Sequence, residues 1–465
     1  MEQTTDTMET WLPRLLGVAP DSPRMDLKSF LDGIPQLESL SDVPRGSRVL
    51  VRGDLDAKPG ATVGKGDIRL RSMQETLDYG RSKGWVQVIF GHIGRDPKGS
   101  LDKVRKRLAE ILKCEVGFIT DWLDPETTTV LDQAAATIAS AAPGGVFLLE
   151  NTRKYPIETV LWKVKPEGIS GVAPKLAKLA NELAGKIARV YVNEAFSAGS
   201  LDSSTTVVPS TMDRVALGKY VAGQFHGPLM DCLNAQLVVS SGLKIDKLDD
   251  LEAMINRGRV RWVFTAGSLA MGLKKAAAEL DGKSFAIGVA EDPAHSDKPY
   301  YVPRARIDQA KKMIAEGRKK GIQFVMPVDF VLQDGRVSET IGAADQQLDV
   351  GPATGALFEE KIGGFLQAAK GFRDPAVAFH NGVFGMFEDP RFEEGTRRFT
   401  AQLKWMHDAG VRVYVGGGEG GKALEKYGRP DWVTHNFTAG GTVLNALGSE
   451  PVPYLVALWM ANQPK

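Results

Sequence analysis

Two segments of the chain combine residue types that bind anions. Residues 88–97 are an apolar run that breaks into small residues and offers the imidazole of His92 and the guanidinium of Arg95. Residues 413–419 form a second apolar run, which ends in three glycines and the carboxylate of Glu419. This pattern is typical of a parallel strand whose carboxyl end faces a ligand. The first segment predicts a site for an anionic substrate, and the second predicts a site for a nucleotide.

More charged side chains follow other predicted strands in the first half of the chain. They are Arg52, Asp54, Glu150, Asn151 and Arg153, and Arg69 opens the next predicted helix. Each arginine alone is typical of a solvated or carboxylate-paired surface residue. Several of them at successive strand ends favour a site for a small doubly charged acid, because guanidinium groups match carboxylate and phosphate bidentately.

The glycines of the second segment, Gly416, Gly417 and Gly418, precede a predicted helix over 423–427. Glycine lets the backbone approach a phosphate closely. Residues 416–422 also fit the first part of a P-loop, but Ala423 stands where a hydroxyl would contact magnesium. A glycine turn that serves packing alone is the alternative interpretation.

Two further features of the second half are candidates for phosphate binding. Residues 438–442, which contain Gly440, precede a predicted helix and would place free N–H groups at an anion. An ordinary N-cap explains the same residues. Lys244 and Lys247 lie just past a predicted strand, where a lysine could reach a transferring phosphoryl group, although lysines on loops are usually solvated.

The elements that must position these residues alternate between strands and helices. Predicted strands cover 48–55, 85–90, 145–149, 190–192, 237–239, 262–264, 324–327, 376–379 and 412–415, and helices cover 70–84, 101–112, 130–141, 173–187, 307–319 and 396–408. This rhythm predicts an α/β protein with two doubly wound parallel-sheet, Rossmann-like lobes joined by a hinge helix. We expect an N-terminal extension (1–30), an acid-binding lobe (31–213), a connector helix (214–235), a nucleotide-binding lobe (236–442) and a C-terminal segment returning to the first lobe (443–465).

Length and composition narrow the class of protein. With 465 residues, two domains are the natural expectation, and 58 Lys and Arg against 57 Asp and Glu argue against binding to nucleic acid or membrane surfaces by bulk charge. The two cysteines match no metal or redox spacing. We therefore expect a cytoplasmic, monomeric protein whose partners are small molecules.

Taken in order, these motifs resemble the phosphoglycerate kinase family from about Leu37 to about Leu458. In the first half, the matching segments are 49–56, 68–70, 92–97, 149–153 and 192–196, which are similar to the family's Arg-Val-Asp-Phe-Asn, Arg-Ile, His-Leu-Gly-Arg-Pro, Leu-Glu-Asn-Leu-Arg and Val-Asn-Asp-Ala-Phe signatures. In the second half, residues 326–329, 349–352 and 381–388 follow the family pattern.

The resemblance implies that the first lobe binds 3-phosphoglycerate and the second binds Mg²⁺ with ATP or ADP, with hinge closure joining them. The reaction would be 1,3-bisphosphoglycerate + ADP = 3-phosphoglycerate + ATP. The substrate residues would be Arg52, Asp54, Asp56, Arg69, His92, Arg95 and Arg153. The nucleotide residues would be Lys244, Lys247, Gly267, Gly351, Pro352, Asn381, Glu388, Gly416, Gly417, Gly418 and Glu419, with Glu419 also at the metal. Catalysis would depend on Arg69, Lys244, Gly417 and Gly440.

The chain departs from the family pattern beside both sites. Asp56 stands where the family has Asn, and residues 200–203, which include Asp202, replace a His-Arg-Ala-His stretch. Glu419 replaces an Asp. Asp56 and Asp202 add negative charge next to the predicted acid site, whereas Glu419 keeps the charge of the residue that it replaces at the nucleotide site. A homologue that acts on another small carboxylate, or a non-catalytic nucleotide-binding or interaction protein, is therefore the alternative.

Overall fold

The computed structural model describes residues 2–243, 245–448 and 451–464. The chain divides into two compact units: unit 1 comprises Met1–His226 and Pro451–Lys465, and unit 2 comprises Gly227–Glu450. The chain thus leaves unit 1 inside the segment predicted as the connector (214–235) and returns to it inside the predicted C-terminal segment (443–465). We expected residues 214–217 to be part of the connector helix, but this prediction is wrong. These residues form strand β6, which pairs with the strand over residues 190–194.

Unit 1 is built on a six-stranded parallel sheet in the order β3-β4-β2-β1-β5-β6. Its strands are β1 (Arg48–Gly53), β2 (Val86–Phe90), β3 (Gly117–Ile119), β4 (Val146–Leu149), β5 (Val190–Glu194) and β6 (Arg214–Leu217). Every residue of β2 is buried, as expected for a parallel strand covered on both faces. The chain runs from β1 to β2 on one side and adds β5 on the other, so the sheet has its switch point at β1.

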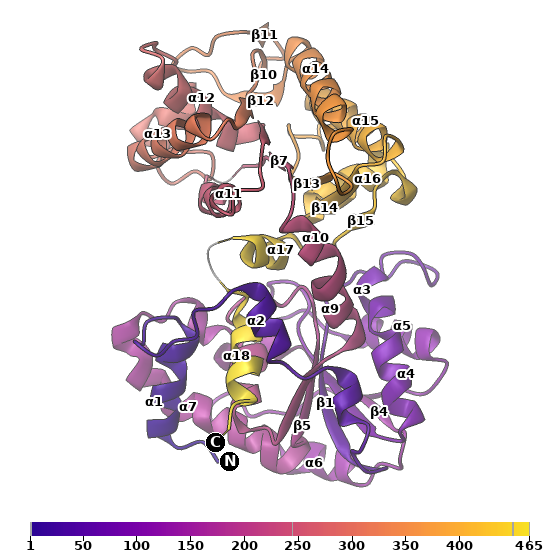
Figure 1. Cartoon of the computed structure of the whole chain (residues 1–465). Helices are drawn as coiled ribbons and strands as arrows, with labels where there is room; N and C mark the ends of the chain where they lie inside the picture. The colour runs from indigo at the N-terminus through magenta and orange to yellow at the C-terminus, as the bar shows by residue number, and fades with distance from the viewer. Residues whose placement is uncertain (1, 244, 449–450, 465) are drawn as a thin grey trace. The chain divides into compact units, whose positions relative to one another are not determined.

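Helices cover both faces of this sheet (Figure 1). They are α1 (Thr5–Leu15), α2 (Leu27–Asp32), α3 (Ile68–Ser72), α4 (Gln74–Ser82), α5 (Asp102–Leu112), α6 (Asp132–Ala139), α7 (Ile169–Glu182), α8 (Ser203–Thr206), α9 (Lys219–Gln224) and α18 (Pro453–Ala461). Apolar residues of β1, β2 and β4 form one core with those of α3, α4 and α5. This core fixes the strand ends from which the charged residues project.

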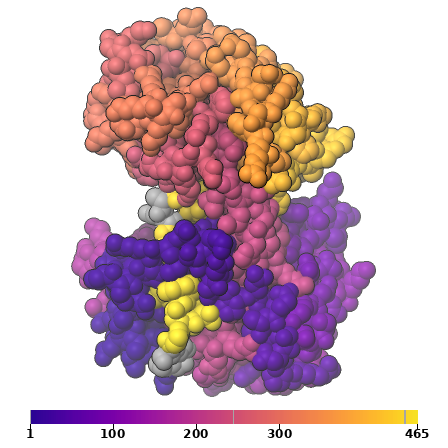
Figure 2. All heavy atoms as spheres, viewed as in Figure 1, coloured from indigo at the N-terminus to yellow at the C-terminus, as the bar shows by residue number. Residues whose placement is uncertain are grey.

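The N-terminal segment is an integral part of unit 1. Helix α1 packs against α7 and α18, and Asn181 exchanges two hydrogen bonds with the main chain of Gln3 (2.8 and 2.7 Å). The Trp11 indole donates to the carbonyl oxygen of Thr206 at 3.0 Å. Figure 2 shows C-terminal residues at the surface beside the N-terminal segment. Both ends of the chain therefore support the helix that follows Asp202.

Unit 2 contains a second six-stranded parallel sheet, in the order β15-β14-β13-β7-β8-β9. Its strands are β7 (Leu237–Ser240), β8 (Trp262–Thr265), β9 (Gln323–Val325), β13 (Val377–Asn381), β14 (Arg412–Gly416) and β15 (His435–Asn436). A small antiparallel sheet adds β10 (Phe330–Leu332), β11 (Val337–Ser338) and β12 (Gln347–Val350). The chain order reverses between β7 and β13, which makes their carboxyl ends the expected place for a ligand.

The helices of unit 2 are α10 (Met230–Cys232), α11 (Lys247–Asn256), α12 (Gly267–Leu280), α13 (Arg304–Lys319), α14 (Pro352–Ala369), α15 (Glu394–Asp408), α16 (Gly418–Tyr427) and α17 (Gly440–Leu447). Aromatic side chains of α14 and α15 pack with β8 in the core. None of the helices in the described ranges of either unit combines the length and apolar composition that a membrane crossing requires. The predicted fold class of two parallel α/β lobes is confirmed.

Candidate functional site

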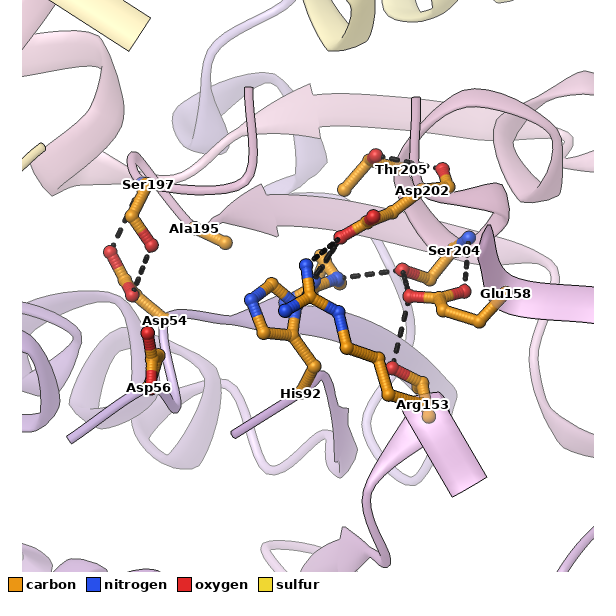
Figure 3. A network of polar contacts seen from close by, with 12 residues as sticks. Asp54, Asp56, His92, Arg153, Glu158, Ala195, Ser197, Asp202, Ser204 and Thr205 are labelled. Carbon is orange, nitrogen blue, oxygen red and sulfur yellow. Dashed lines mark hydrogen bonds and ion pairs between the residues drawn. The ribbon is translucent and has the colours of Figure 1, made fainter. Parts of the chain in front are cut away.

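The strand ends of unit 1 bring three basic side chains together (Figure 3). Arg52 lies near the end of β1, His92 follows β2, and Arg153 lies in the short helix after β4. Arg52 Nη2 lies 2.8 Å from His92 Nδ1. Parallel strands end at the same edge of a sheet, so residues far apart in sequence meet here. The sequence predicted that these basic side chains lie close together, but it did not predict which group lies between them.

The carboxylate of Asp202 lies at the centre of these basic groups. Its Oδ2 is 3.5 Å from Arg52 Nη2, 3.2 Å from His92 Nδ1 and 3.5 Å from Arg153 Nη2. Its Oδ1 accepts a hydrogen bond from the Trp162 indole at 3.0 Å. The Asp202 and Arg52 side chains are 0% and 1% exposed, respectively. The protein itself therefore supplies a carboxylate to these basic groups and offsets part of their charge.

A second carboxyl group, Glu158, reaches Arg52 indirectly, through the side chain of Ser204. The Ser204 hydroxyl lies 2.6 Å from Glu158 Oε1, and the Ser204 main-chain N–H donates to Glu158 Oε2 at 2.9 Å. Arg52 Nε donates in turn to Ser204 Oγ at 2.8 Å. Figure 3 shows this chain of contacts next to Asp202. The arrangement holds Arg52 in one orientation.

Burial and charge act in opposite directions on these groups. Burial disfavours an ionised Asp202, but His92 and the two arginines outweigh burial and hold the pKa of Asp202 below its usual value. Burial lowers the pKa of His92, against the raising effect of Asp202. Burial and the charge of Asp202 raise the pKa of Glu158. The cluster therefore contains an ionised Asp202, a neutral imidazole and a carboxyl group that resists ionisation.

The other predicted substrate residues lie beside this cluster. Arg69 Nη1 donates to the main-chain oxygen of Asp56 at 2.9 Å and lies 3.2 Å from its carboxylate. Gly94 N–H donates to Asp56 Oδ1 at 2.9 Å. Burial raises the pKa of Asp56, but Gly94 and Arg69 outweigh burial and hold it below its usual value. Asp56 thus compensates the charge of Arg69.

Asp54 and Arg95 complete the predicted set. Asp54 accepts hydrogen bonds from the Ser197 main chain (3.1 Å) and hydroxyl (2.7 Å), and lies 3.8 Å from Arg69 Nε. Arg95 is exposed on the loop after β2. Among the described residues it makes no ion pair, unlike Arg52, Arg69 and Arg153. Arg95 is therefore the predicted cation that is free to meet a ligand.

His92, Glu158 and Asp202 offer ligand atoms within 4.8 Å of one another, a spacing that suits a metal ion. Arg52 contacts both His92 and Asp202, however, and already supplies the positive charge that a metal would bring. The donor set fits an internal ion-pair cluster better than a metal centre.

In unit 2, contacts concentrate at the switch point between β7 and β13. Lys247 Nζ, at the start of α11, donates to the main-chain oxygen of Ser241 (2.7 Å) and to Asn381 Oδ1 (2.9 Å). Gly382 has φ +99°, and a Cβ there would come within 2.2 Å of the Ser241 oxygen. Burial lowers the pKa of Lys247, against the raising effect of Glu419. Lys247 and Asn381 were predicted here from the sequence.

A cavity of about 410 Å³ opens next to this switch point. Its lining includes three predicted residues, Gly267, Glu388 and Glu419. Apolar residues such as Met271 and Leu348 form much of the remaining wall. A mostly apolar cavity of this size with carboxylates at its edge suits a small-molecule ligand that also carries charged groups.

Glycines allow close backbone approach beside the cavity. A Cβ on Gly267, which has φ +65°, would come within 2.7 Å of the Gly242 oxygen. A Cβ on Gly440 would come within 2.4 Å of Gly417 Cα. The starts of α12 and α17 therefore need glycine for contacts with other loops. Gly416 ends β14, Gly417 caps α16 with φ +97°, and Gly418, whose Cβ would meet nothing within 4 Å, is the first residue of that helix. The free N–H groups of these helix starts can bind an anion.

Other predicted nucleotide residues do not line this cavity. Gly351 and Pro352 begin α14, where a Cβ on Gly351 would meet the Asp329 carboxylate. Asp329 accepts hydrogen bonds from the Ala353 and Thr354 main chain, so the glycine makes room for a helix cap. Lys244, which we expected at the transferring phosphoryl group, lies outside the described residues.

Sequence reasoning missed the residues that enclose the two sites. Glu158 and Trp162 belong to a 3₁₀ helix (Pro156–Trp162) that carries no motif, and only the contacts with Ser204 and Asp202 reveal their place. Tyr300 and Phe387 line the cavity from loops. Phe387 lies in residues 381–388, which resemble the family pattern, and this resemblance is the signal that could have placed it at the cavity.

A family model described as phosphoglycerate kinase matches residues 40–450. The chain belongs to the phosphoglycerate kinase family. The phosphoglycerate kinase of Clostridium botulinum is 30% identical over 433 residues, covering 89% of this chain and 96% of the relative. That of Synechococcus sp. is 29% identical over 441 residues, covering 90% and 96%.

Solved phosphoglycerate kinases share the fold. The Pyrococcus horikoshii structure superposes with a TM-score of 0.69 at 24% identity, covering 92% of this chain and 99% of that one. The Coxiella burnetii structure gives a TM-score of 0.65 at 22% identity, covering 91% and 99%. The predicted membership of the phosphoglycerate kinase family is confirmed.

Proposed function

We propose that this chain is a phosphotransferase that moves a phosphoryl group between Mg-ATP or Mg-ADP and the carboxylate of a small acid. Family membership supports this activity, and the names of the relatives point to 3-phosphoglycerate as the first acid to test. The single observation that carries it is the cavity of unit 2, which lies at the switch point of a parallel sheet beside three glycine-led helix starts.

The residues around the cavity fit a nucleotide. The apolar wall suits a purine, and Glu388 suits a ribose hydroxyl. The N-termini of α12, α16 and α17 suit phosphates, because their free N–H groups carry partial positive charge. Glu419 suits Mg²⁺, which proteins often hold through one carboxylate together with substrate phosphates. Magnesium, when bound, would neutralise phosphate charge.

In the reaction, a carboxylate oxygen of the acid attacks the γ-phosphorus of ATP. The new bond joins that oxygen to phosphorus, the bond to the β–γ bridging oxygen breaks, and ADP leaves with its electron pair. No proton transfer is required, so positioning and charge stabilisation account for the catalysis. We assign stabilisation of the transferring group from the acid side to Arg69 of unit 1, as the family resemblance implies, and its guanidinium is partly exposed.

The proposal is tested by acyl-phosphate formation. The protein is incubated with Mg-ATP and a panel of acids, and hydroxylamine traps the product. Arg69→Ala should reduce the rate by at least about 100-fold, as expected for loss of a charged transition-state contact. Arg71→Ala is the matched control, since Arg71 lies on the same helix and pairs with Asp67. Unchanged turnover in Arg69→Ala would contradict the mechanism.

Calorimetry with Mg-ADP separates the alternatives. Binding together with turnover supports the kinase. Binding of nucleotide without turnover of any acid would instead favour a non-catalytic nucleotide-binding protein, and absence of both would favour an interaction protein.

A further inference from the structure

Asp202 occupies the point at which the basic groups of unit 1 converge. Arg52, His92 and Arg153 all lie within 3.5 Å of its Oδ2. None of the described groups, these three included, forms a hydrogen bond of normal geometry to this oxygen. An anionic oxygen of a ligand at the same point would have the same three neighbours. In this chain the protein supplies that oxygen.

The position of Asp202 is fixed by its own main chain. Its carbonyl oxygen accepts hydrogen bonds from the Thr205 and Thr206 hydroxyls at 2.9 and 2.8 Å, and from the two corresponding main-chain N–H groups at 3.0 Å. Trp162 holds the other carboxylate oxygen. The main-chain contacts fix the backbone at Asp202, and rotation of its carboxylate away from the arginines would break the hydrogen bond from Trp162. Displacement of the carboxylate by an incoming anion would therefore cost this hydrogen bond.

The remaining charges favour a singly charged ligand. Four guanidinium groups (Arg52, Arg69, Arg95, Arg153) stand with three carboxylates (Asp54, Asp56, Asp202) around this part of unit 1, and Glu158 resists ionisation. About one net positive charge therefore remains for a ligand. Each negative charge of a phosphate placed at about 4 Å from Asp202 would weaken binding about 1000-fold relative to the same arginines without Asp202, at an effective dielectric constant of about 20.

We propose that Asp202 is a resident anion that fills the anion subsite of unit 1, so that the site selects an acid whose only anionic group is its carboxylate. The choice of an acid as ligand rests on the proposed function. The occupation of the subsite by Asp202 does not, and it is tested separately.

Inorganic phosphate is the probe for the subsite. Titration calorimetry compares the wild type with Asp202→Ala, which opens the site, and with Asp202→Asn, which removes the charge but keeps the shape. Asp213→Ala is the control, because Asp213 pairs with Arg189 at the surface of the same unit. We expect phosphate to bind Asp202→Ala at least about 10-fold more tightly than the wild type or the control.

Turnover of a matched pair of acids, glycerate and 3-phosphoglycerate, then tests selectivity. The wild type should have the higher kcat/KM for glycerate, and Asp202→Ala should shift the ratio at least about 10-fold toward 3-phosphoglycerate. The proposal would be overturned if the wild type and Asp202→Ala bound phosphate with equal affinity. It would also be overturned if the wild type had the higher kcat/KM for 3-phosphoglycerate.

The two proposals fail in different ways. If no acid forms an acyl phosphate, the proposed function fails while the phosphate titration still decides the role of Asp202. If neither Asp202 variant folds, the wild-type measurements decide it, since they require no substitution.

Discussion

Glu194 provides a pH-dependent contribution to the stability of unit 1 that can be calculated from its surroundings. Its side chain is fully buried at the end of β5. Thr76 Oγ1 and the Tyr220 N–H donate to Oε1 at 2.7 and 3.1 Å, and the Val221 N–H donates to Oε2 at 3.3 Å. Burial raises the pKa of Glu194 to about 7, although these three donors lower it.

The magnitude follows from the difference between the folded and unfolded pKa values. The pKa rises from 4.5 to about 7, and at ~1.36 kcal/mol per pKa unit this corresponds to about 3 kcal/mol. Below pH 4.5 both states are protonated and the contribution is complete. Between pH 4.5 and 7 the folded protein keeps a proton that the unfolded chain has lost, so stability falls as pH rises. Above pH 7 the contribution is lost.

Urea unfolding from pH 5 to pH 8 measures this effect in the wild type and in Glu194→Gln. Stability of the wild type should fall with pH, and the fall should be smaller in the variant by about 2 to 3 kcal/mol over this range. Glu167→Gln, at an exposed glutamate of the same unit that does not shift the pKa of Glu194, is the control and should keep the wild-type profile. Parallel profiles for the wild type and Glu194→Gln would refute the reasoning.

Two further substitutions test how the sites are supported. Trp11→Phe removes the indole donor to the buried Thr206 carbonyl. The substitution should lower the free energy of unfolding by about 1 to 3 kcal/mol and the Tm of unit 1 by roughly 2 to 10 °C. An unchanged Tm in a thermal melt would contradict a stabilising role for this hydrogen bond. Gly440→Ala should weaken Mg-ADP binding at least about 10-fold by calorimetry, because its Cβ would meet Gly417. Gly441→Ala, where a Cβ meets nothing within 4 Å, is the matched control, and equal affinities in the two variants would contradict the close-approach explanation.

Much of the fold could be predicted because its central strands are continuous apolar runs. The run that ends at Arg52 predicted β1, and the run before His92 predicted β2, close to their observed bounds. The missed strands β3 and β15 are short edge strands with exposed or half-buried residues, so hydrophobicity does not mark them. The predicted helix over 70–84 is interrupted at Met73, where α3 ends and α4 begins.

The candidate site could be predicted only as far as the strand order allowed. Strand ends indicated where Arg52 and His92 would project, because parallel strands end at one edge. Their ion-pair partner could not be predicted, because Asp202 comes from a loop 150 residues beyond Arg52 in sequence. The sequence indicated that Asp202 adds negative charge near the predicted acid site. It did not indicate that Asp202 is buried among the basic groups, because that position depends on the contacts of Asp202 with α8.

The two units therefore differ in how their sites are specified. In unit 2 the close approaches are between main-chain atoms, as at Gly440 and Gly417, so a side chain at these glycines would disturb two helix starts at once. In unit 1 the site is specified by side-chain charges around one loop carboxylate, Asp202. On the proposed function, a single substitution at such a position would change which anion binds while the parallel sheet stays intact. Nucleotide binding in unit 2 and acid selection in unit 1 would then change independently in this chain, because no described side chain is shared between the two sets of contacts.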